Sequence, residues 1–558
     1  MPDDTGGDSS SQFRYKNAAI ASDSATCSQI GREILEEGGS AVDAAIGSLL
    51  CIGTMNPNNI GIGGGHFLMH YNAGRKEVSM YDAREVAPLA ATEDMFVNDT
   101  TGRSTRGGLA IAVPGDVKGY YEVHRDHGRL PWKRLFEPSI RLARDGFAVT
   151  DDLGGAIAGR EEVIREEPNM RNLFVKSNGE LLAEGDTFRH PRYADTLEAI
   201  AENGGDYFYN EMADDIVRDI EDAGGIITRE DLRQYNVRRR NPISITLNGG
   251  FKVYTPPPPS SGVVVSLIFN ILDGFFGSSP DADNYFKEQS LLGLTYHRLV
   301  EAFKFGFGQR GNLADSSFVN VYDVVNRLTS RRTADEIRET IKDDGVYDNR
   351  FYGNVLDTLD DRGTSHLSVI DKDGNAVSVT QTLNFGFGSK VLGSRTGIVF
   401  NNEMDDFAVP GGPPNAFGFS PTDVNLIAPG KRPQSSMAPV IIVDSNYDVY
   451  MVIGSSGGSR IISAIPQAFS FIHFGQHSLA NAVDQPRIHQ QWLPADIHYD
   501  GDFARSILDD LQSRGQVLAS EANTNVYSVI QVVKRESDGY LYAHSDKRRG
   551  KYTGPDGY

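Results

Sequence analysis

The pattern of hydrophobic and polar positions changes its period near residue 364 of this chain. Between residues 18 and 240 the apolar positions recur mainly at helical spacing. A pair of glycines, Gly38 and Gly39, ends the first such segment, and Ser40 precedes the second as an N-cap. The pattern predicts helices over residues 29–37, 41–52, 195–202 and 211–222, of which 41–52 is almost wholly apolar and is therefore expected to be buried.

After residue 364 the apolar positions alternate, as they do in strands with one buried face. A hairpin signal at residues 371–374 separates the first two expected strands. The expected pairs are 366–370 with 376–383 and 440–443 with 449–453, and a helical pattern resumes over 460–474. Two antiparallel sets of strands, with helices before and after them, predict an α+β fold of stacked sheets with helices outside.

Two segments lie between these halves. The proline-rich run 256–262 interrupts all regular structure. Because the apolar segment 263–276 follows at once, we expect a rigid loop within one domain rather than a linker. Residues 333–344 are charged and predict a solvated helix with Thr333 as its N-cap.

Composition and charge narrow the class of protein. The 558 residues include 54 basic and 75 acidic side chains, a net charge of −21, which argues against nucleic acid or an anionic membrane as the main partner. Residues 1–16 are polar and acidic, so we expect them to be disordered, and they lack the features of a signal peptide. The nearest candidate for a membrane helix, 263–276, contains Asp273 and is too short. These features predict a soluble globular protein.

The junction between Gly363 and Thr364 carries the first chemical hypothesis. If this bond is cut, the new α-amine of Thr364 can deprotonate its own hydroxyl, which makes an N-terminal threonine a covalent nucleophile. The alternative is a plain turn that leads into a strand. The residues after the junction decide between the two.

Two polar clusters follow on the predicted strands and turns. Asn384 lies two residues after Thr382, at the end of the strand that pairs with the Thr364 strand, although an asparagine can also simply end a strand. Further on, Glu403, Asp405 and Asp406 could hold a substrate ammonium group, or could form a solvated turn. The residues alone do not choose between Asp405 and Asp406.

Two more clusters offer hydrogen-bond donors. Ser435 and Ser436 lie between prolines that stiffen the backbone, where their hydroxyls could bind a carboxylate or belong to an ordinary loop. Gly457 and Gly458 follow a strand and open a helix, which suits an anion site made of backbone amides. An acyl-transfer enzyme needs such donors for its oxyanion.

The first half adds one cation and one misleading motif. Arg84 is a candidate carboxylate clamp, unless it forms a salt bridge with Asp82 or Glu85. The segment 61–66 resembles a dinucleotide loop, but its sixth residue is His66 and a helix, not a strand, is expected before it. Close backbone approach explains these glycines better. Together the clusters describe an enzyme for an α-amino acid attached through its side-chain acyl group.

The chain resembles the γ-glutamyltranspeptidase (glutathione hydrolase) family of N-terminal-nucleophile hydrolases, most closely its animal members. The similarity extends from about residue 17 to residue 558. The matching motifs are residues 61–65, 83–88, 363–366, 382–384, 401–407, 431–439 and 457–460, in family order.

This resemblance implies a four-layer αββα sandwich and self-cleavage at Gly363–Thr364 into a heavy part, 17–363, and a light part, 364–558, that form one intertwined domain. It implies attack by Thr364 on the γ-glutamyl amide of glutathione or its S-conjugates, release of cysteinylglycine, and resolution by water, an amino acid or a dipeptide. No cofactor or metal is expected. By the same resemblance, Thr382 orients the nucleophile, and Gly457 and Gly458 form the oxyanion hole. The substrate's α-carboxylate would bind Arg84, Ser435 and Ser436. Its α-amino group would bind Asn384, Glu403 and Asp406.

The resemblance also bears on location. Cys27 and Cys51, which could otherwise be free thiols, match a disulfide of the animal members, and Asn98 lies near a glycosylated position. A second family disulfide, expected near residues 170–176, has no cysteines here, and the membrane anchor of the animal enzymes is not visible. An ectodomain, a secreted form or a missing N-terminal segment are the expectations.

Two other functions compete with this one. A related acylase of the glutaryl or cephalosporin type would leave Glu403 and Asp406 buried without an ammonium partner. An unprocessed, non-catalytic homologue with a secreted signalling role would have no need for the full set of site residues.

Overall fold

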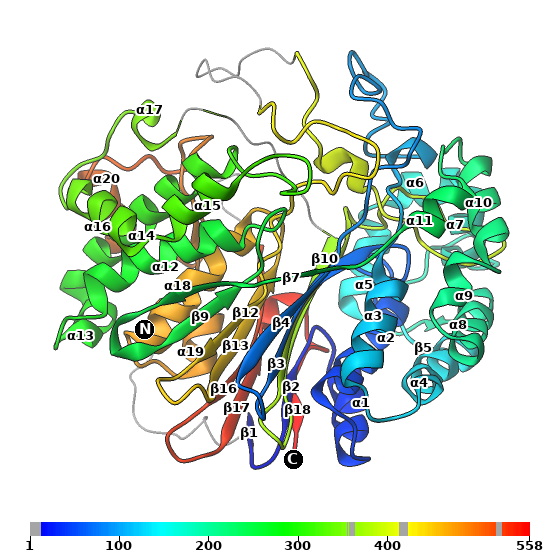
Figure 1. Ribbon diagram of the computed structural model, residues 1–558, viewed down its shortest axis with the longest axis horizontal. Helices are drawn as coiled ribbons and strands as arrows, with labels where there is room; N and C mark the ends of the chain where they lie inside the picture. Colours follow the sequence, from blue (N-terminus) through cyan, green and yellow to red (C-terminus); the bar gives the residue numbers. More distant parts are fainter. Residues whose placement is uncertain (1–12, 354, 356–362, 412–421, 521–526) are drawn as a thin grey trace.

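The computed structural model describes residues 13–353, 355, 363–411, 422–520 and 527–558. Two seven-stranded sheets face each other, and helices cover the outer face of each (Figure 1). Side chains of Phe67, Met69, Ile441 and Val452 fill the space between the sheets. The predicted αββα sandwich is therefore confirmed for the described residues.

Both sheets mix strands from before and after residue 363. The first sheet has the order β1-β17-β16-β13-β12-β9-β8, comprising Arg14–Tyr15, Leu541–Ser545, Val529–Arg535, Val449–Ser456, Val440–Val443, Lys252–Thr255 and Ile243–Thr246. The second has the order β18-β2-β10-β11-β3-β4-β7, comprising Asp556–Gly557, Ala19–Ala21, Gly363–Ile370, Ala376–Asn384, Gly65–Asn72, Glu77–Ala83 and Arg238–Arg240. The two halves of the chain are thus interleaved at strand level.

Two helical layers complete the sandwich. α1 (Ala25–Glu36), α2 (Ala41–Met55), α3 (Asp116–His127), α4 (Trp132–Asp145) and α8 (Pro191–Asn203) belong to the layer beside the second sheet. α12 (Gly262–Phe276), α14 (Gln289–Arg310), α16 (Arg331–Thr340), α18 (Arg460–His473) and α20 (Arg505–Ser513) belong to the layer beside the first sheet. No helix in the described parts of the chain is long and apolar enough to cross a membrane.

Local sequence features, such as helix caps and turn residues, correctly predicted most of the expected helices and strands. Ser40 and Asp43 form a capping box at the start of α2, and every residue of α2 is buried, as its composition predicted. The hairpin of β10 and β11 and the pair β12 and β13 are also confirmed. The proline-rich run lies in the short connection between β9 and α12, within one domain.

Three expectations are corrected. The charged helix α16 begins at Arg331 with Ser330 as N-cap, so Thr333 lies inside its first turn. Arg14 and Tyr15 pair with β17, so order begins before residue 17, whereas residues 1–12 lie outside the described residues. The helical pattern assigned to 18–240 missed β3, because a strand buried along almost its whole length shows no alternation.

Candidate active site

Thr364 lies on β10, an inner strand of the second sheet, where the strand register shifts between Gly363 and Thr364. Its side chain is buried, and its Oγ1 lies 3.0 Å from Oγ1 of Thr382 on β11. The Thr382 hydroxyl donates to the Gly363 carbonyl at 2.7 Å and accepts from the amide of Asn384 at 2.8 Å. Because that donation uses its only proton, the hydroxyl of Thr364 donates to Thr382. The Thr382 hydroxyl is therefore bonded to both sides of the predicted scissile bond.

A glycine is required on the other side of that bond. A Cβ on Gly363 would come within 2.5 Å of the Phe385 carbonyl carbon, so the backbone after Asn384 leaves no room for a side chain. This close approach explains locally why a glycine precedes the predicted nucleophile.

Arg549, near the C-terminus, joins the threonine to the predicted oxyanion loop. Its Nη2 donates to the carbonyl of Thr364 and to Oγ of Ser456, each at 2.8 Å. Nη2 also forms an ion pair with Asp23 at 2.8 Å. Since Ser456 immediately precedes Gly457, this guanidinium places the glycine pair beside Thr364. Sequence reasoning missed Arg549, because Lys547-Arg548-Arg549 has the composition of an exposed basic run.

Gly457 and Gly458 connect β13 to α18. Their φ angles are +116° and +62°, in the region that favours glycine. A Cβ on Gly457 would also meet the Tyr527 carbonyl oxygen at 2.5 Å. Consecutive residues of this kind at a helix start can turn backbone amides towards an anion, as the sequence predicted.

Arg84 is fully buried and contacts the acidic cluster. Its Nη1 lies 2.7 Å from Oε2 of Glu403, and its Nη2 is paired with Asp406. Glu85 lies 3.4 Å from Nη1. The predicted carboxylate clamp and two residues of the predicted ammonium site are therefore direct neighbours, although more than 300 residues separate them in the chain.

The structure distinguishes Asp405 from Asp406, between which the residues alone did not choose. Asp406 points to Arg84, whereas Asp405 accepts a hydrogen bond from Ser104 at 2.5 Å. Asp405 thus belongs to a different contact, which supports Asp406 as the member of the predicted site.

Several buried acceptor atoms have no hydrogen-bond partner among the described residues. Oδ1 of Asn384 and Oε1 of Glu403 are two of them, and Oε1 of Glu85 is a third at this site. The side chain of Asn384 is oriented by its Nδ2, which donates to the carbonyl of Asn402 at 3.2 Å. Such oxygens are costly to leave unpaired, and they match the needs of an ammonium group with its three donors.

The serine pair borders the same guanidinium. Arg84 donates from Nε to the carbonyl of Pro433 at 3.3 Å and from Nη2 to that of Gln434 at 3.2 Å, immediately before Ser435. Ser435 Oγ accepts from the amide of Met437, and Ser436 Oγ accepts from Arg310. Both serines are buried, and the backbone immediately before Ser435 contacts Arg84, while their role as a carboxylate site stays a prediction.

Burial among like charges shifts two carboxyl groups of this cluster. Burial, opposed by Arg84, raises the pKa of Glu85 to about 8. The same two causes, with Glu85 and Asp406 adding to the burial, hold the pKa of Glu403 well above its usual range. Sequence reasoning had given Glu85 no role beyond a salt bridge to Arg84. Because burial favours the protonated forms of these carboxyl groups, an added cation would favour their ionised forms instead.

Other predicted positions are also found. Cys27 and Cys51 form a disulfide between α1 and α2, which confirms the pairing. Asn98 is exposed in a turn, where glycosylation stays a prediction. The described residues contain no cluster of metal-ligating side chains. In the glycine-rich segment 61–66, Gly63 and Gly64 pack against the backbone of Val399 and Thr382, which is the close backbone approach that the sequence predicted.

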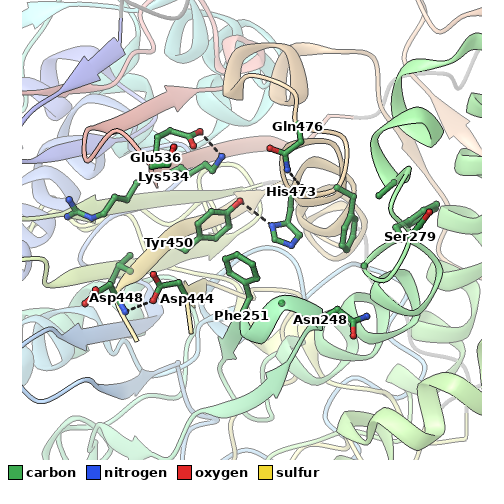
Figure 2. A pocket seen from close by; sticks show the side chains of 18 residues that line it. Asn248, Phe251, Ser279, Asp444, Asp448, Tyr450, His473, Gln476, Lys534 and Glu536 are labelled. Carbon is green, nitrogen blue, oxygen red and sulfur yellow. Dashed lines mark hydrogen bonds and ion pairs between the residues drawn. The ribbon is translucent and has the colours of Figure 1, made fainter. Parts of the chain in front are cut away.

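A separate pocket of about 660 Å³ lies near the ends of α12 and α18. Figure 2 shows Tyr450 directed at His473, and Lys534 directed at Glu536. None of the predicted site residues lines it. The rings of Phe251, Tyr450 and His473 contact one another at centroid distances of 4.7–5.6 Å, so they do not enclose a space between them.

Comparison with known proteins identifies the family. The family model described as gamma-glutamyltranspeptidase matches residues 27–555. The chain belongs to the γ-glutamyltranspeptidase family.

Its relatives span animals and plants. Scoloptoxin SSD14 of Scolopendra dehaani is 40% identical over 96% of this chain and 92% of its own length. Glutathione hydrolase 3 of Arabidopsis thaliana is 40% identical over 97% and 85%, and glutathione hydrolase 5 proenzyme of Mus musculus is 36% identical over 97% and 93%.

Solved structures of the same fold agree with this assignment. Cephalosporin acylase from Bacillus halodurans aligns with a TM-score of 0.81 at 27% identity, covering 100% of this chain and 99% of that one. γ-Glutamyltranspeptidase from Helicobacter pylori aligns with a TM-score of 0.54 at 32% identity, covering 58% and 91%. Both support the N-terminal-nucleophile hydrolase sandwich.

Proposed function

We propose that this member of the γ-glutamyltranspeptidase family is a self-processing γ-glutamyl hydrolase and transferase with Thr364 as its nucleophile. The observation that carries the proposal is the Thr382 hydroxyl, which donates to the Gly363 carbonyl and accepts from Thr364. It can polarise the scissile carbonyl, and it can accept the proton of the attacking hydroxyl as it passes its own proton to the carbonyl oxygen.

Cleavage then proceeds in two steps. Oγ1 of Thr364 bonds to the Gly363 carbonyl carbon, the C–N bond breaks, and the proton passes to the new α-amine. Water hydrolyses the resulting ester and leaves Gly363 as a carboxylate and Thr364 with a free hydroxyl. A relative whose name includes the word proenzyme supports this maturation.

Turnover uses the same atoms. The α-amine of Thr364 takes the hydroxyl proton as Oγ1 attacks a γ-glutamyl amide, and the departing amine receives it. The backbone amides of Gly457 and Gly458 stabilise the oxyanion, and Arg549 holds their loop beside Thr364. Water, an amino acid or a dipeptide then releases the γ-glutamyl group.

The charge balance of the site supports an α-amino acid as the bound part of the substrate. Its carboxylate would bind Arg84 with Ser435 and Ser436, in exchange for the present ion pairs. Its ammonium would bind the unpartnered oxygens of Asn384 and Glu403, together with Asp406. We propose glutathione and its S-conjugates as donors, with cysteinylglycine as the first product of glutathione.

The cephalosporin acylase structure favours one alternative, an acylase for glutaryl-type side chains. Such a side chain presents a carboxylate without an ammonium group. It would leave Glu403 and Asp406 buried beside Arg84 with no new cation, at a cost in desolvation. The acidic cluster therefore favours a γ-glutamyl substrate.

We further propose that residues 17–363 and 364–558 remain together as heavy and light subunits. The disulfide between Cys27 and Cys51 supports an oxidising environment, and thus a secreted or cell-surface location. A carbohydrate on the exposed Asn98 would agree with that location.

The proposal is tested with purified protein on a denaturing gel and a chromogenic γ-glutamyl anilide. We expect two bands and turnover for the natural chain, and one uncut band without turnover for Thr364→Ala. A glutaryl anilide distinguishes the acylase, which would hydrolyse it in preference to the γ-glutamyl compound. Two bands from Thr364→Ala would show that the nucleophile lies elsewhere.

A further inference from the structure

The glycine-rich segment that ends in His66 lies directly behind the reacting threonines. In the register of β3 and β11, Gly65 is opposite Thr382 and His66 is opposite Gln381. A Cβ on Gly64 would come within 2.1 Å of the Thr382 carbonyl oxygen. The backbone of Gly64 therefore packs against the residue whose hydroxyl contacts the scissile junction.

Asp116, the first residue of α3, joins this glycine to the neighbouring strand. Its carboxylate accepts a hydrogen bond from Nε2 of Gln381 at 2.7 Å. Its own amide donates to the Gly64 carbonyl at 3.1 Å. One residue thus fixes both the segment behind Thr382 and the residue immediately before Thr382.

Two rings complete this buried network. Nδ1 of His66 lies 2.6 Å from Oδ1 of Asp116, and the ring of Tyr120 stacks on the imidazole at 5.0 Å. The Tyr120 hydroxyl donates to Oε1 of Gln381. All four side chains are excluded from solvent. Buried polar groups that bond one another in this way restrain the backbone around them, and departures from the bonded geometry are costly.

Burial also fixes the protonation of the network. It lowers the pKa of His66 to about 3 and raises the pKa of Asp116 well above its usual range. The imidazole of His66 is therefore uncharged at neutral pH. The carboxyl group of Asp116 stays protonated up to a higher pH than an exposed aspartate does. The contact between them is a hydrogen bond within the core.

We propose that Asp116, acting through Gln381 and the backbone of Gly64, is a positioning residue for Thr382 and hence for the Thr364 nucleophile. The inference rests on the proposed function, because it needs Thr364 to react. It also gives the glycine-rich segment a role: Gly64 allows close approach to Thr382, and His66, which does not fit a dinucleotide site, is the partner of Asp116. Small displacements of reacting groups can lower rates by about 10².

The test compares two buried glutamines. Gln381→Ala removes the link between Asp116 and β11. Gln516→Ala is the matched control, because Gln516 is also buried and bonds Glu301 and Lys304 in a network away from the site residues. For Gln381→Ala we expect cleavage and kcat of the cleaved enzyme to fall roughly tenfold to hundredfold, with KM within about threefold. For Gln516→Ala we expect a lower Tm and an unchanged kcat.

Wild-type cleavage and kcat in Gln381→Ala would overturn the inference, as would an equal loss of kcat in both variants. If Gln381→Ala does not fold, Tyr120→Phe removes only one hydroxyl from the network. It should lower kcat several-fold without changing KM, and an unchanged kcat there would also reject the positioning role. A natural chain that stays uncut and inactive would reject the proposed function itself, and the inference with it.

Discussion

Arg84 carries one positive charge among three carboxyl groups that are buried with it, Glu85, Glu403 and Asp406. The sequence offers the carboxylates of 403–406 as equals, but the structure gives them different neighbours. Asp406 is paired with Arg84, and Asp405 is bonded to Ser104. These contacts distinguish Asp406, which we propose as a ligand of the substrate ammonium, from Asp405.

This difference provides a matched pair of variants. We expect Asp406→Asn to raise KM for a γ-glutamyl anilide about 10- to 100-fold, since a hydrogen bond to a charged group contributes ~1.5–3 kcal/mol. Asp405→Asn should leave KM within about threefold. Steady-state kinetics of the two cleaved proteins measures both values. Equal effects would mean that Asp406 has no special role in binding.

The raised pKa values predict a pH dependence of binding. Below pH 8 Glu85 holds a proton, because burial raises its pKa to about 8, and the pKa of Glu403 is raised for the same reason. A bound ammonium favours the ionised carboxylates, so L-glutamate binding at pH 7 should release protons. Its affinity should increase from pH 6 to 8.

Titration calorimetry in two buffers of different ionisation enthalpy measures this release. Glu85→Gln removes one of the titrating groups and should reduce the number of protons released. Proton uptake on binding would contradict the assigned direction.

The connection between β13 and α18 contains the two glycines of the proposed oxyanion site. Gly457 and Gly458 both have positive φ angles there, and a Cβ on Gly457 would also meet the backbone of Tyr527. The strand ends beside Thr364, and the helix that follows begins with amides that have no partner within the helix. Ordinary strand-to-helix geometry is therefore the basis of the oxyanion donors that we propose here.

Gly457→Ala should therefore lower kcat about 10²- to 10³-fold, the usual result of losing an oxyanion donor. Gly501→Ala is the control, because a Cβ there would meet no atom within 4 Å and its φ is not positive. Kinetics of both proteins, with circular dichroism to confirm folding, gives the comparison. Near-natural kcat in Gly457→Ala would remove this loop from the mechanism.

At the scale of the whole molecule, cutting after Gly363 cannot separate the two halves without breaking both sheets. β10 lies between β2 and β11. In the other sheet, β12 lies between β13 and β9 (Figure 1). Each of these triplets contains strands from both sides of the junction. The core between the sheets also contains Phe67 and Ile441, one from each side.

The cleaved protein should consequently behave as one folding unit. We expect the two bands of the denaturing gel to co-elute in size-exclusion chromatography and to unfold in one thermal transition. Thr364→Ala, which stays uncut, should elute at the same volume. Separation of the two parts without denaturant would contradict the interleaved sheets.

The sequence predicted much of the fold because many of its signals are local. The Ser40 cap, the apolar α2 and the hairpin before β11 each depend on residues within a few positions of one another. It failed for β3, whose continuous burial removes the alternation on which strand prediction depends. The start of α16 was misplaced because Ser330 and Thr333 are both suitable caps.

The sequence by itself also determined the chemical inventory: a threonine after a glycine, two glycines before a helix, and an arginine, serines and carboxylates in family order. Only the tertiary structure decided how they meet. It paired Arg84 with Asp406, brought Arg549 to Thr364, and placed Asp116 behind Thr382. The physical reason is that capping and periodicity act between near neighbours, whereas buried charges select partners through space, across 322 residues for Arg84 and Asp406.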